Sequence, residues 1–257
     1  MFKIGDMVTR KSYNNDVIFK IIDINNNIAI LKGIDIRLMA DSKLEDLKIY
    51  TGSLSENNEN WLDNIEEDLD RSDFFYMPGK ILHIDGDCEY LNKCIKLYNR
   101  YNVMAYGICI KESEMKDKIV EHLQAIKPDI LVITGHDSFK KRGKLDDVSS
   151  YMNSSNFISA VREARNYERA HDKLIIIAGA CGSYYEALIK SGANFASSPK
   201  RINIHALDPA IVALKVSLTD VNKDINIKDI IDKTKYGKDG IGGIITHGTM
   251  FIGYPRT

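Results

Sequence analysis

The chain has 257 residues, which is enough for one large domain or for a small domain joined to a medium one. Its 35 basic and 36 acidic side chains are mixed along the sequence, and a formal charge of -1 argues against nucleic acid or an anionic membrane as a partner. No stretch approaches the ~20 apolar residues that cross a bilayer, and the first residues lack the apolar core of an export signal, so we expect a cytoplasmic protein.

The first fifty residues contain short β-prone runs separated by Asn-rich turns. This pattern predicts a small β-barrel of SH3-like size over residues 1–50. Its strands are expected at Met7–Thr9, Val17–Ile24, Ile28–Lys32 and Ile36–Leu38. Residues 51–75 are acidic and polar, and we predict a linker there that contains one short helix.

From residue 76 to residue 257, apolar runs without alternation are separated by amphipathic stretches. This is typical of a parallel sheet covered by helices on both faces, and it predicts an α/β fold. Strands are expected at Lys80–Ile84, Val103–Ile110, Ile130–Thr134, Leu174–Ala178 and Ile202–His205. Helices are expected at Glu89–Tyr101, Glu112–Ile126, Asn156–Ala170, Tyr184–Lys190 and Pro209–Leu218, and a Gly-rich turn over 237–243 should lead into a final strand.

Two of the predicted strands end in similar ways, each with a reactive side chain. One runs from Ile130 through Gly135 to His136, and the other runs from Leu174 through Gly179 to Cys181. Because parallel strands place their carboxyl ends at one edge of the sheet, a thiol and an imidazole would meet there if the strands are neighbours. We therefore predict Cys181 as a nucleophile and His136 as its general base.

The residues beside this pair could hold a developing oxyanion. Gly182 leaves the backbone N–H of Cys181 unobstructed, and the N–H of Asp137 follows the histidine. A helix beginning after Gly182 would place its positive end near the thiol and favour the thiolate.

The order and spacing of the two residues resemble those of the caspase, legumain and gingipain peptidases. His136 precedes Cys181 by 45 residues, and in caspases the histidine lies about 50 residues upstream of the cysteine. In that group no strict third member of a triad is required. The group usually has Gly directly after the histidine, whereas this chain has Asp137.

The remaining cysteines and histidines are interpreted as structural. Cys88, Cys94 and Cys109 show neither a CxxC pair nor a zinc-ligand spacing, so we expect reduced thiols and no metal or other cofactor. His247 is a rival base because it follows an apolar run, but it comes after the cysteine in the chain.

Substrate contacts are expected from loops at the same edge of the sheet. Asp85 and Asp87 follow the first strand of the α/β region and could recognise a basic side chain, although Asp87 could instead cap the next helix. Ser197 and Ser198 follow a short extended segment and could offer backbone to a substrate strand, or belong to a plain surface connection.

Several motifs resemble the YabG family of sporulation-specific peptidases. They include Gly5-Asp6-Met7-Val8-Thr9-Arg10, Arg37-Leu38-Met39-Ala40-Asp41-Ser42, the segment from Pro128 to Asp137, Ala178-Gly179-Ala180-Cys181-Gly182-Ser183, and Ile252-Gly253-Tyr254-Pro255-Arg256. The resemblance implies a mother-cell cysteine peptidase that trims spore coat and cortex-associated proteins near arginine and then associates with the forming coat. It places the catalytic roles on Cys181 and His136.

Two other functions use the same sequence features. A spore-coat scaffold without catalysis would leave Cys181 unreactive, and a small-molecule amidase would use the same cysteine and histidine. The N-terminal barrel is expected to bind protein because it lacks the basic stripe of a nucleic-acid reader. The oligomeric state is left open.

Overall fold

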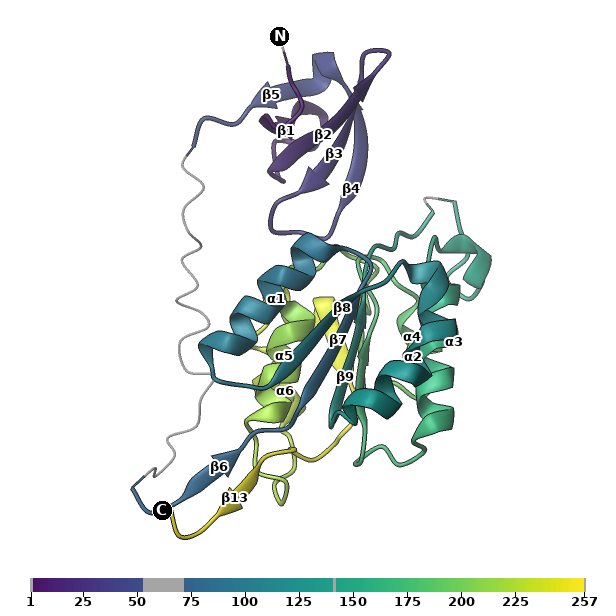
Figure 1. Ribbon diagram of the computed structural model, residues 1–257. Coiled ribbons are helices and arrows are strands. Elements are labelled where there is room, and N and C mark those ends of the chain that lie inside the picture. Colours follow the sequence, from purple (N-terminus) through teal and green to yellow (C-terminus); the bar gives the residue numbers. More distant parts are fainter. Residues whose placement is uncertain (1, 53–71, 141, 257) are drawn as a thin grey trace. The chain divides into compact units, whose positions relative to one another are not determined.

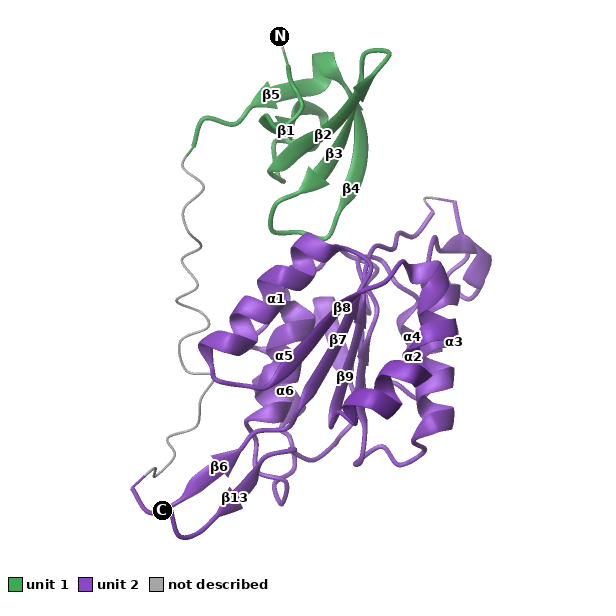
Figure 2. Cartoon of the chain, in the orientation of Figure 1, with its two compact units in different colours: residues 1–60 green, residues 61–257 purple. Residues whose placement is uncertain are grey.

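The structure is a computed structural model that describes residues 2–52, 72–140 and 142–256 (Figure 1). The chain divides into two compact units, Met1–Asn60 and Trp61–Thr257 (Figure 2). Most of the predicted linker over 51–75, with its short helix, lies outside the described residues.

The first unit is a five-stranded antiparallel sheet with the strand order β4-β3-β2-β1-β5, which agrees with the predicted small β domain. Its strands are β1 (Met7–Arg10), β2 (Phe19–Asn25), β3 (Ile28–Gly33), β4 (Met39–Lys43) and β5 (Leu47–Ile49), and 3-10 turns cover Lys11–Tyr13 and Leu44–Asp46. Phe19, Ile21 and Leu31 are fully buried in its core. The strand predicted at Ile36–Leu38 is wrong, because Gly33 N–H donates to Leu38 O and closes a turn there before β4 begins.

The second unit contains a six-stranded sheet with the order β12-β11-β10-β9-β7-β8, in which only β12 runs antiparallel to its neighbour. The strands are β7 (Ile81–Asp85), β8 (Ala105–Cys109), β9 (Ile130–Thr134), β10 (Ile175–Ala178), β11 (Phe195–Ser197) and β12 (Ile241–Gly243). Every residue of β7, β9 and β10 is buried, as expected for strands covered on both faces. The predicted caspase-like α/β architecture is confirmed.

Helices cover both faces of this sheet (Figure 1). One core packs α1 (Cys88–Arg100), α5 (Asp208–Ser217) and α6 (Ile227–Ile231) against the sheet. The other packs α2 (Glu112–Ile126), α3 (Ser154–Tyr167) and α4 (Tyr185–Lys190) against the opposite face. A 3-10 turn spans Val148–Ser150, a short helix α7 (Gly237–Gly240) precedes β12, and β6 (Phe75–Met77) pairs with β13 (Phe251–Gly253).

Two predictions for this unit are wrong. The fifth parallel strand is β11 rather than Ile202–His205, because the backbone of Ile202 and Ile204 bonds to the loop around Cys181 instead of to the sheet. The thiols of Cys88 and Cys109 were expected to be reduced, but they form a disulfide between the start of α1 and the end of β8. The chain brings these residues together because β7 and β8 are paired, a relation that cysteine spacing does not reveal. Cys94 and Cys181 are buried and take no part in this disulfide.

Candidate active site

The residues predicted to carry chemistry follow three strands that are direct neighbours. Strand β9 pairs in parallel with β7 on one side and with β10 on the other. Asp87 follows β7, His136 follows β9 and Cys181 follows β10, so all three leave the sheet at its carboxyl edge. The strands that precede Cys181 and His136 are therefore adjacent, as the predicted pairing of these two residues requires.

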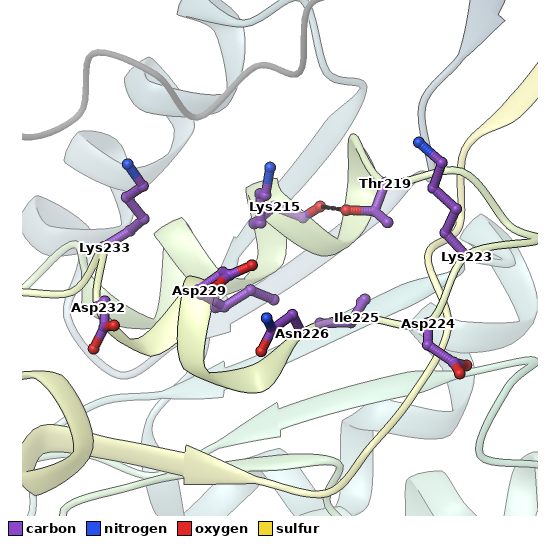
Figure 3. A pocket seen from close by; sticks show the side chains of 10 residues that line it. Lys215, Thr219, Lys223, Asp224, Ile225, Asn226, Asp229, Asp232 and Lys233 are labelled. Carbon is purple, nitrogen blue, oxygen red and sulfur yellow. Dashed lines mark hydrogen bonds between the residues drawn. The ribbon is translucent and has the colours of Figure 1, made fainter.

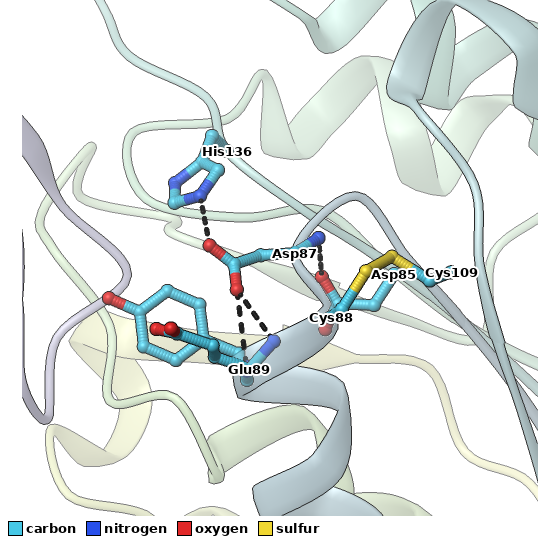
Figure 4. The surroundings of a disulfide bond; sticks show 7 residues. Asp85, Asp87, Cys88, Glu89, Cys109 and His136 are labelled. Atoms are coloured by element: carbon cyan, nitrogen blue, oxygen red, sulfur yellow. Dashed lines mark hydrogen bonds and ion pairs between the residues drawn. A yellow bond between two sulfur atoms is a disulfide. The ribbon is translucent and has the colours of Figure 1, made fainter. Parts of the chain in front are cut away.

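His136 is held by contacts to both its ring and its backbone. Its Nε2 lies 2.9 Å from Oδ2 of Asp87 (Figure 4). Its backbone N–H donates to Oε1 of Glu112 at 2.8 Å, and its carbonyl oxygen accepts from Nδ2 of Asn153 at 2.9 Å. The ring of Tyr90 meets the imidazole edge-on, with 5.8 Å between ring centroids. The contacts with Asp87 and Tyr90 orient the imidazole, and those with Glu112 and Asn153 hold the backbone of His136.

The second imidazole nitrogen of His136 is available. Its Nδ1 is buried and has no hydrogen-bond partner within residues 2–52, 72–140 and 142–256. A buried polar atom without a partner is uncommon and often marks a functional site. An imidazole with one nitrogen bound to a carboxylate and the other open can accept a proton at the open nitrogen.

Asp87 also caps α1, which confirms the alternative interpretation of this residue. Its Oδ1 accepts from the backbone N–H groups of Glu89 and Tyr90, at 2.9 and 3.3 Å. Such a cap satisfies two of the N–H groups that the first turn of a helix leaves without partners. Figure 4 shows the carboxylate between the first turn of α1 and the imidazole of His136.

Cys181 lies in the loop after β10 with a side chain that is 1% exposed. Its Sγ accepts a hydrogen bond from the backbone N–H of Ile204 at 3.2 Å, and the thiol donates to the carbonyl oxygen of the same residue at 3.8 Å. The next residue, Gly182, has a φ of +65°, and its N–H donates to Ile202 O and to Oγ of Ser198. This left-handed conformation is easily adopted only by glycine.

The loops after His136 and after Cys181 are in direct contact. A Cβ placed on Gly182 would lie 3.0 Å from the backbone nitrogen of Phe139. The carboxylate of Asp137 bridges the same loops, because its Oδ2 accepts from Oγ of Ser183 at 2.9 Å while Ser183 accepts from the N–H of Ala180. The segments that contain Cys181 and His136 are thus held together.

Asp137 is buried, and its carboxylate accepts four hydrogen bonds. Its Oδ1 accepts from the N–H groups of Ser138 and Asn153, and its Oδ2 accepts from the hydroxyls of Ser154 and Ser183. Burial raises the pKa of Asp137 above its ordinary value, although these four hydrogen bonds act in the opposite direction. The Asp137 side chain therefore supports the two loops.

Comparison with known proteins identifies the family of this chain. The family model described as YabG peptidase U57 matches residues 3–255. The sporulation-specific protease YabG of Bacillus subtilis (strain 168) is 42% identical over 286 aligned positions, which include 99% of this chain and 98% of the relative. The chain belongs to the YabG peptidase U57 family. It is therefore a peptidase and a sporulation protease, and family membership confirms the resemblance on which these predictions depended.

The other acidic and serine residues predicted to bind substrate are buried in this YabG-family chain. Asp85 is fully buried, and its carboxylate accepts from the hydroxyl of Thr134 and from the N–H of Asp87. Ser198 is buried with its hydroxyl between Gly182 N and Ile202 O, whereas Oγ of Ser197 is buried with no partner among the described residues. Their substrate-binding roles stay predictions, and here the Asp85 and Ser198 side chains support the loops around Asp87 and Cys181.

His247, the rival base, lies elsewhere. Because β12 is antiparallel to β11, the chain leaves β12 toward the edge at which the parallel strands begin. His247 then lies beside Asp224, with 2.9 Å between Nδ1 and Oδ1, and its side chain is 55% exposed. This arrangement favours His136 as the base.

Sequence reasoning did not find several supporting groups of the YabG-family site. Ser183, Ser154 and Asn153 bind Asp137, and the N–H of Ile204 binds the thiol. Ser183 could have been suspected from its place two residues after Cys181. Ser154 and Ile204 could not have been identified from the sequence, since only folding brings their segments to the edge of the sheet.

A pocket of about 500 Å³ lies away from these residues, near the end of α5 and around α6 (Figure 3). Three lysines and three aspartates lie around it, among them Lys215, Lys223 and Asp229, so it offers no net charge to a charged ligand. Figure 3 shows the ammonium groups of Lys215, Lys223 and Lys233 at the ends of extended side chains. In the described part of the chain, no helix is long and apolar enough to span a membrane, and no group of His, Cys, Asp and Glu side chains is arranged to hold a metal ion.

Proposed function

We propose that this peptidase is a cysteine endopeptidase in which Cys181 is the nucleophile and His136 is the general base and acid. The observation that carries the proposal is the contact between the two loops, formed by the Asp137 to Ser183 hydrogen bond and by the packing of Gly182 on Phe139. Both catalytic side chains are thereby anchored to one rigid edge of the sheet, which is the arrangement that nucleophilic catalysis requires.

The proposed reaction begins when His136 takes the thiol proton of Cys181. The sulfur attacks the peptide carbonyl carbon, and the carbonyl π electrons move onto oxygen. The backbone N–H groups of Cys181 and Asp137 are the proposed donors to that oxyanion. Collapse of the intermediate breaks the C–N bond, and the imidazolium protonates the departing amine. Water, deprotonated by the same imidazole, then hydrolyses the thioester and restores the thiol.

The burial of Cys181 adds a condition to this mechanism. Its side chain is 1% exposed, and Ile204 donates its N–H to the sulfur. A substrate carbonyl can reach Sγ only if a neighbouring segment moves. We propose that residues 202–204 move, since Ile202 and Ile204 contact the Cys181 loop through backbone hydrogen bonds.

The proposed substrates are spore coat and cortex-associated proteins, cleaved next to arginine. The relative from Bacillus subtilis is a sporulation-specific protease, which supports a role during sporulation. We propose that the protein acts in the mother cell and then associates with the forming coat. Asp85 and Asp87 are the predicted partners for an arginine side chain, and Asp87 is the more accessible of the two because Asp85 is fully buried.

The test compares Cys181→Ala and His136→Ala with wild type on fluorogenic peptides that carry arginine, lysine or neutral residues at the cleavage site. We expect both substitutions to lower kcat/KM by at least ~10³-fold, as removal of a nucleophile or base does in other hydrolases. Cys94→Ala is the matched control, because Cys94 is also a buried thiol outside the disulfide and lies within α1, on the side that faces the core. Undiminished cleavage by Cys181→Ala would refute the proposal, and equal rates on arginine and neutral peptides would refute the arginine preference.

A further inference from the structure

We infer that Asp87 is a positioning residue for His136 and completes a Cys181, His136 and Asp87 triad. The inference rests on the proposed function, since it assigns a role toward the proposed base. Comparison with caspase-like peptidases predicts that no third side chain is needed, and the structure supplies one nevertheless. The contact that carries the inference is the 2.9 Å separation between Asp87 Oδ2 and His136 Nε2.

The two carboxylate oxygens of Asp87 have separate partners. Oδ1 accepts from the backbone N–H groups at the start of α1, contributed by Glu89 and Tyr90, and Oδ2 faces the imidazole. The backbone N–H of Asp87 donates to Oδ1 of Asp85 at 2.9 Å, which fixes the residue from behind. A carboxylate that is anchored in this way can hold an imidazole at a fixed angle, because its own rotation would break two helix-capping bonds.

The surroundings favour the ionised form of this carboxylate. Asp87 lies at the N-terminus of a 13-residue helix, where the helix dipole and unpaired N–H groups stabilise negative charge. The side chain is 10% exposed, so water screens its charge only weakly. A carboxylate beside Nε2 therefore stabilises the imidazolium that forms when the thiol gives up its proton.

The contact also selects the tautomer of His136. An ionised carboxylate only accepts hydrogen bonds, so Nε2 must carry the proton of the neutral imidazole. The proton acceptor is then Nδ1, the buried nitrogen that has no hydrogen-bond partner in the described ranges 2–52, 72–140 and 142–256. The orphan nitrogen and the carboxylate contact are independent observations, and both agree with a base that is held through one nitrogen and acts through the other.

The competing interpretation is that Asp87 only caps α1. Two substitutions separate the roles, because Ser and Asn are as good as Asp at an N-cap position. Asp87→Ser keeps the cap but is too short and uncharged to replace the carboxylate at His136. Asp87→Asn keeps the cap and the size but removes the charge, and its amide can present an N–H where an acceptor is needed. Asp147→Asn is the matched control, since Asp147 caps a 3-10 turn and binds Ser149.

The experiment measures kcat, KM and the urea midpoint of the full-length variants, together with the pH dependence of Cys181 alkylation by iodoacetamide, read by mass spectrometry. We expect Asp87→Ser and Asp87→Asn to lower kcat by ~10²–10⁴-fold, the range known for a triad carboxylate. On substrates without arginine at the cleavage site, where the proposed contact of Asp87 with arginine is absent, KM should change by less than about twofold. The urea midpoint should stay close to that of wild type, because both variants keep the helix cap. The pH of half-maximal alkylation should rise in both variants, because the imidazolium loses its counter-charge, and Asp147→Asn should behave as wild type in every assay.

A double variant provides the decisive result. If Asp87 acts through His136, Asp87→Ser should add little to the loss caused by His136→Ala, since members of a catalytic unit are strongly non-additive. A kcat of Asp87→Ser within about threefold of wild type would overturn the inference while leaving the cysteine mechanism intact. Activity retained by Cys181→Ala or His136→Ala would instead overturn the proposed function, so the two failures are distinguishable.

Discussion

Oδ2 of Asp137 accepts a 2.9 Å hydrogen bond from Oγ of Ser183, and this bond joins the residue after the candidate base to the residue two positions after the candidate nucleophile. Ser154 reinforces the connection, since its hydroxyl donates to Asp137 and accepts from the N–H of Tyr184. The loops of β9 and β10 are therefore tied by side chains as well as by strand pairing. The geometry of the site depends on this small polar cluster.

Gly182→Ala should reduce both stability and activity. A residue with φ near +65° costs about 1 kcal/mol more when glycine is replaced by alanine. The new methyl group would also lie 3.0 Å from the nitrogen of Phe139, so the cysteine and histidine loops must separate. We expect the free energy of unfolding to fall by about 2 kcal/mol and kcat/KM to fall by about 100-fold, as measured by urea denaturation and peptide cleavage.

Gly237→Ala is the control for this substitution. Gly237 has a φ of +53° and no heavy atom within 4 Å of an added Cβ, so it bears the conformational cost without the collision. It should lose about 1 kcal/mol of stability and keep its activity. Equal losses of activity in the two variants would show that contact between the loops does not matter.

Ser183→Ala should loosen the site without removing a catalytic group. The substitution leaves the N–H of Ala180 without its acceptor and takes one donor from Asp137, both in a buried environment. We expect a loss of about 1–3 kcal/mol in the free energy of unfolding and a fall in kcat of about 10-fold to 100-fold. Ser159→Ala removes a hydroxyl that donates to the carbonyl oxygen of Ser155 within α3, away from Asp137, and it should match wild type. A Ser183→Ala enzyme with full kcat would be inconsistent with a tethering role.

Reduction of the Cys88 to Cys109 disulfide should lower stability. The bond closes a loop with a sequence separation of 21 residues, for which the chain-entropy description gives about 3 kcal/mol. Urea unfolding of wild type with and without dithiothreitol measures the loss. A Cys88→Ser/Cys109→Ser double variant should resemble reduced wild type and be insensitive to dithiothreitol, whereas identical unfolding curves for oxidised and reduced wild type would contradict this prediction.

His171 should make the stability of the folded protein depend on pH below about 6.5, the ordinary pKa of a histidine side chain. Partial desolvation and the nearby Arg165 guanidinium lower the pKa of His171 from 6.5 in the folded protein. The unfolded chain therefore binds the proton more readily, and stability should decrease as pH falls from 6.5 through the lowered folded value. Above pH 6.5 this effect should be absent. Urea midpoints of wild type and His171→Gln across this range give the test, and parallel pH profiles for both proteins would contradict it.

The local sequence determined much of the α/β unit. Helix α2 has the predicted bounds Glu112–Ile126, and β9 has the predicted bounds Ile130–Thr134. Both predictions were possible because the spacing of apolar residues along the chain indicates a helix or a strand without knowledge of distant contacts. The same reasoning placed Cys181 and His136 at strand ends. The strand predicted at Ile202–His205 failed because its backbone groups bond to a distant loop, and local propensity does not report such a partner.

What the tertiary structure decided is the set of partners around the two reactive residues. The sequence by itself determined the nucleophile and base candidates and the fold that carries them. Only folding could show that Asp87 lies against His136, that Asp137 binds Ser183, and that Cys88 meets Cys109. Each of these contacts joins residues that follow or end different strands. The order of strands in the sheet determines which strand ends are neighbours. That order depends on packing across the whole unit rather than on neighbours in the chain.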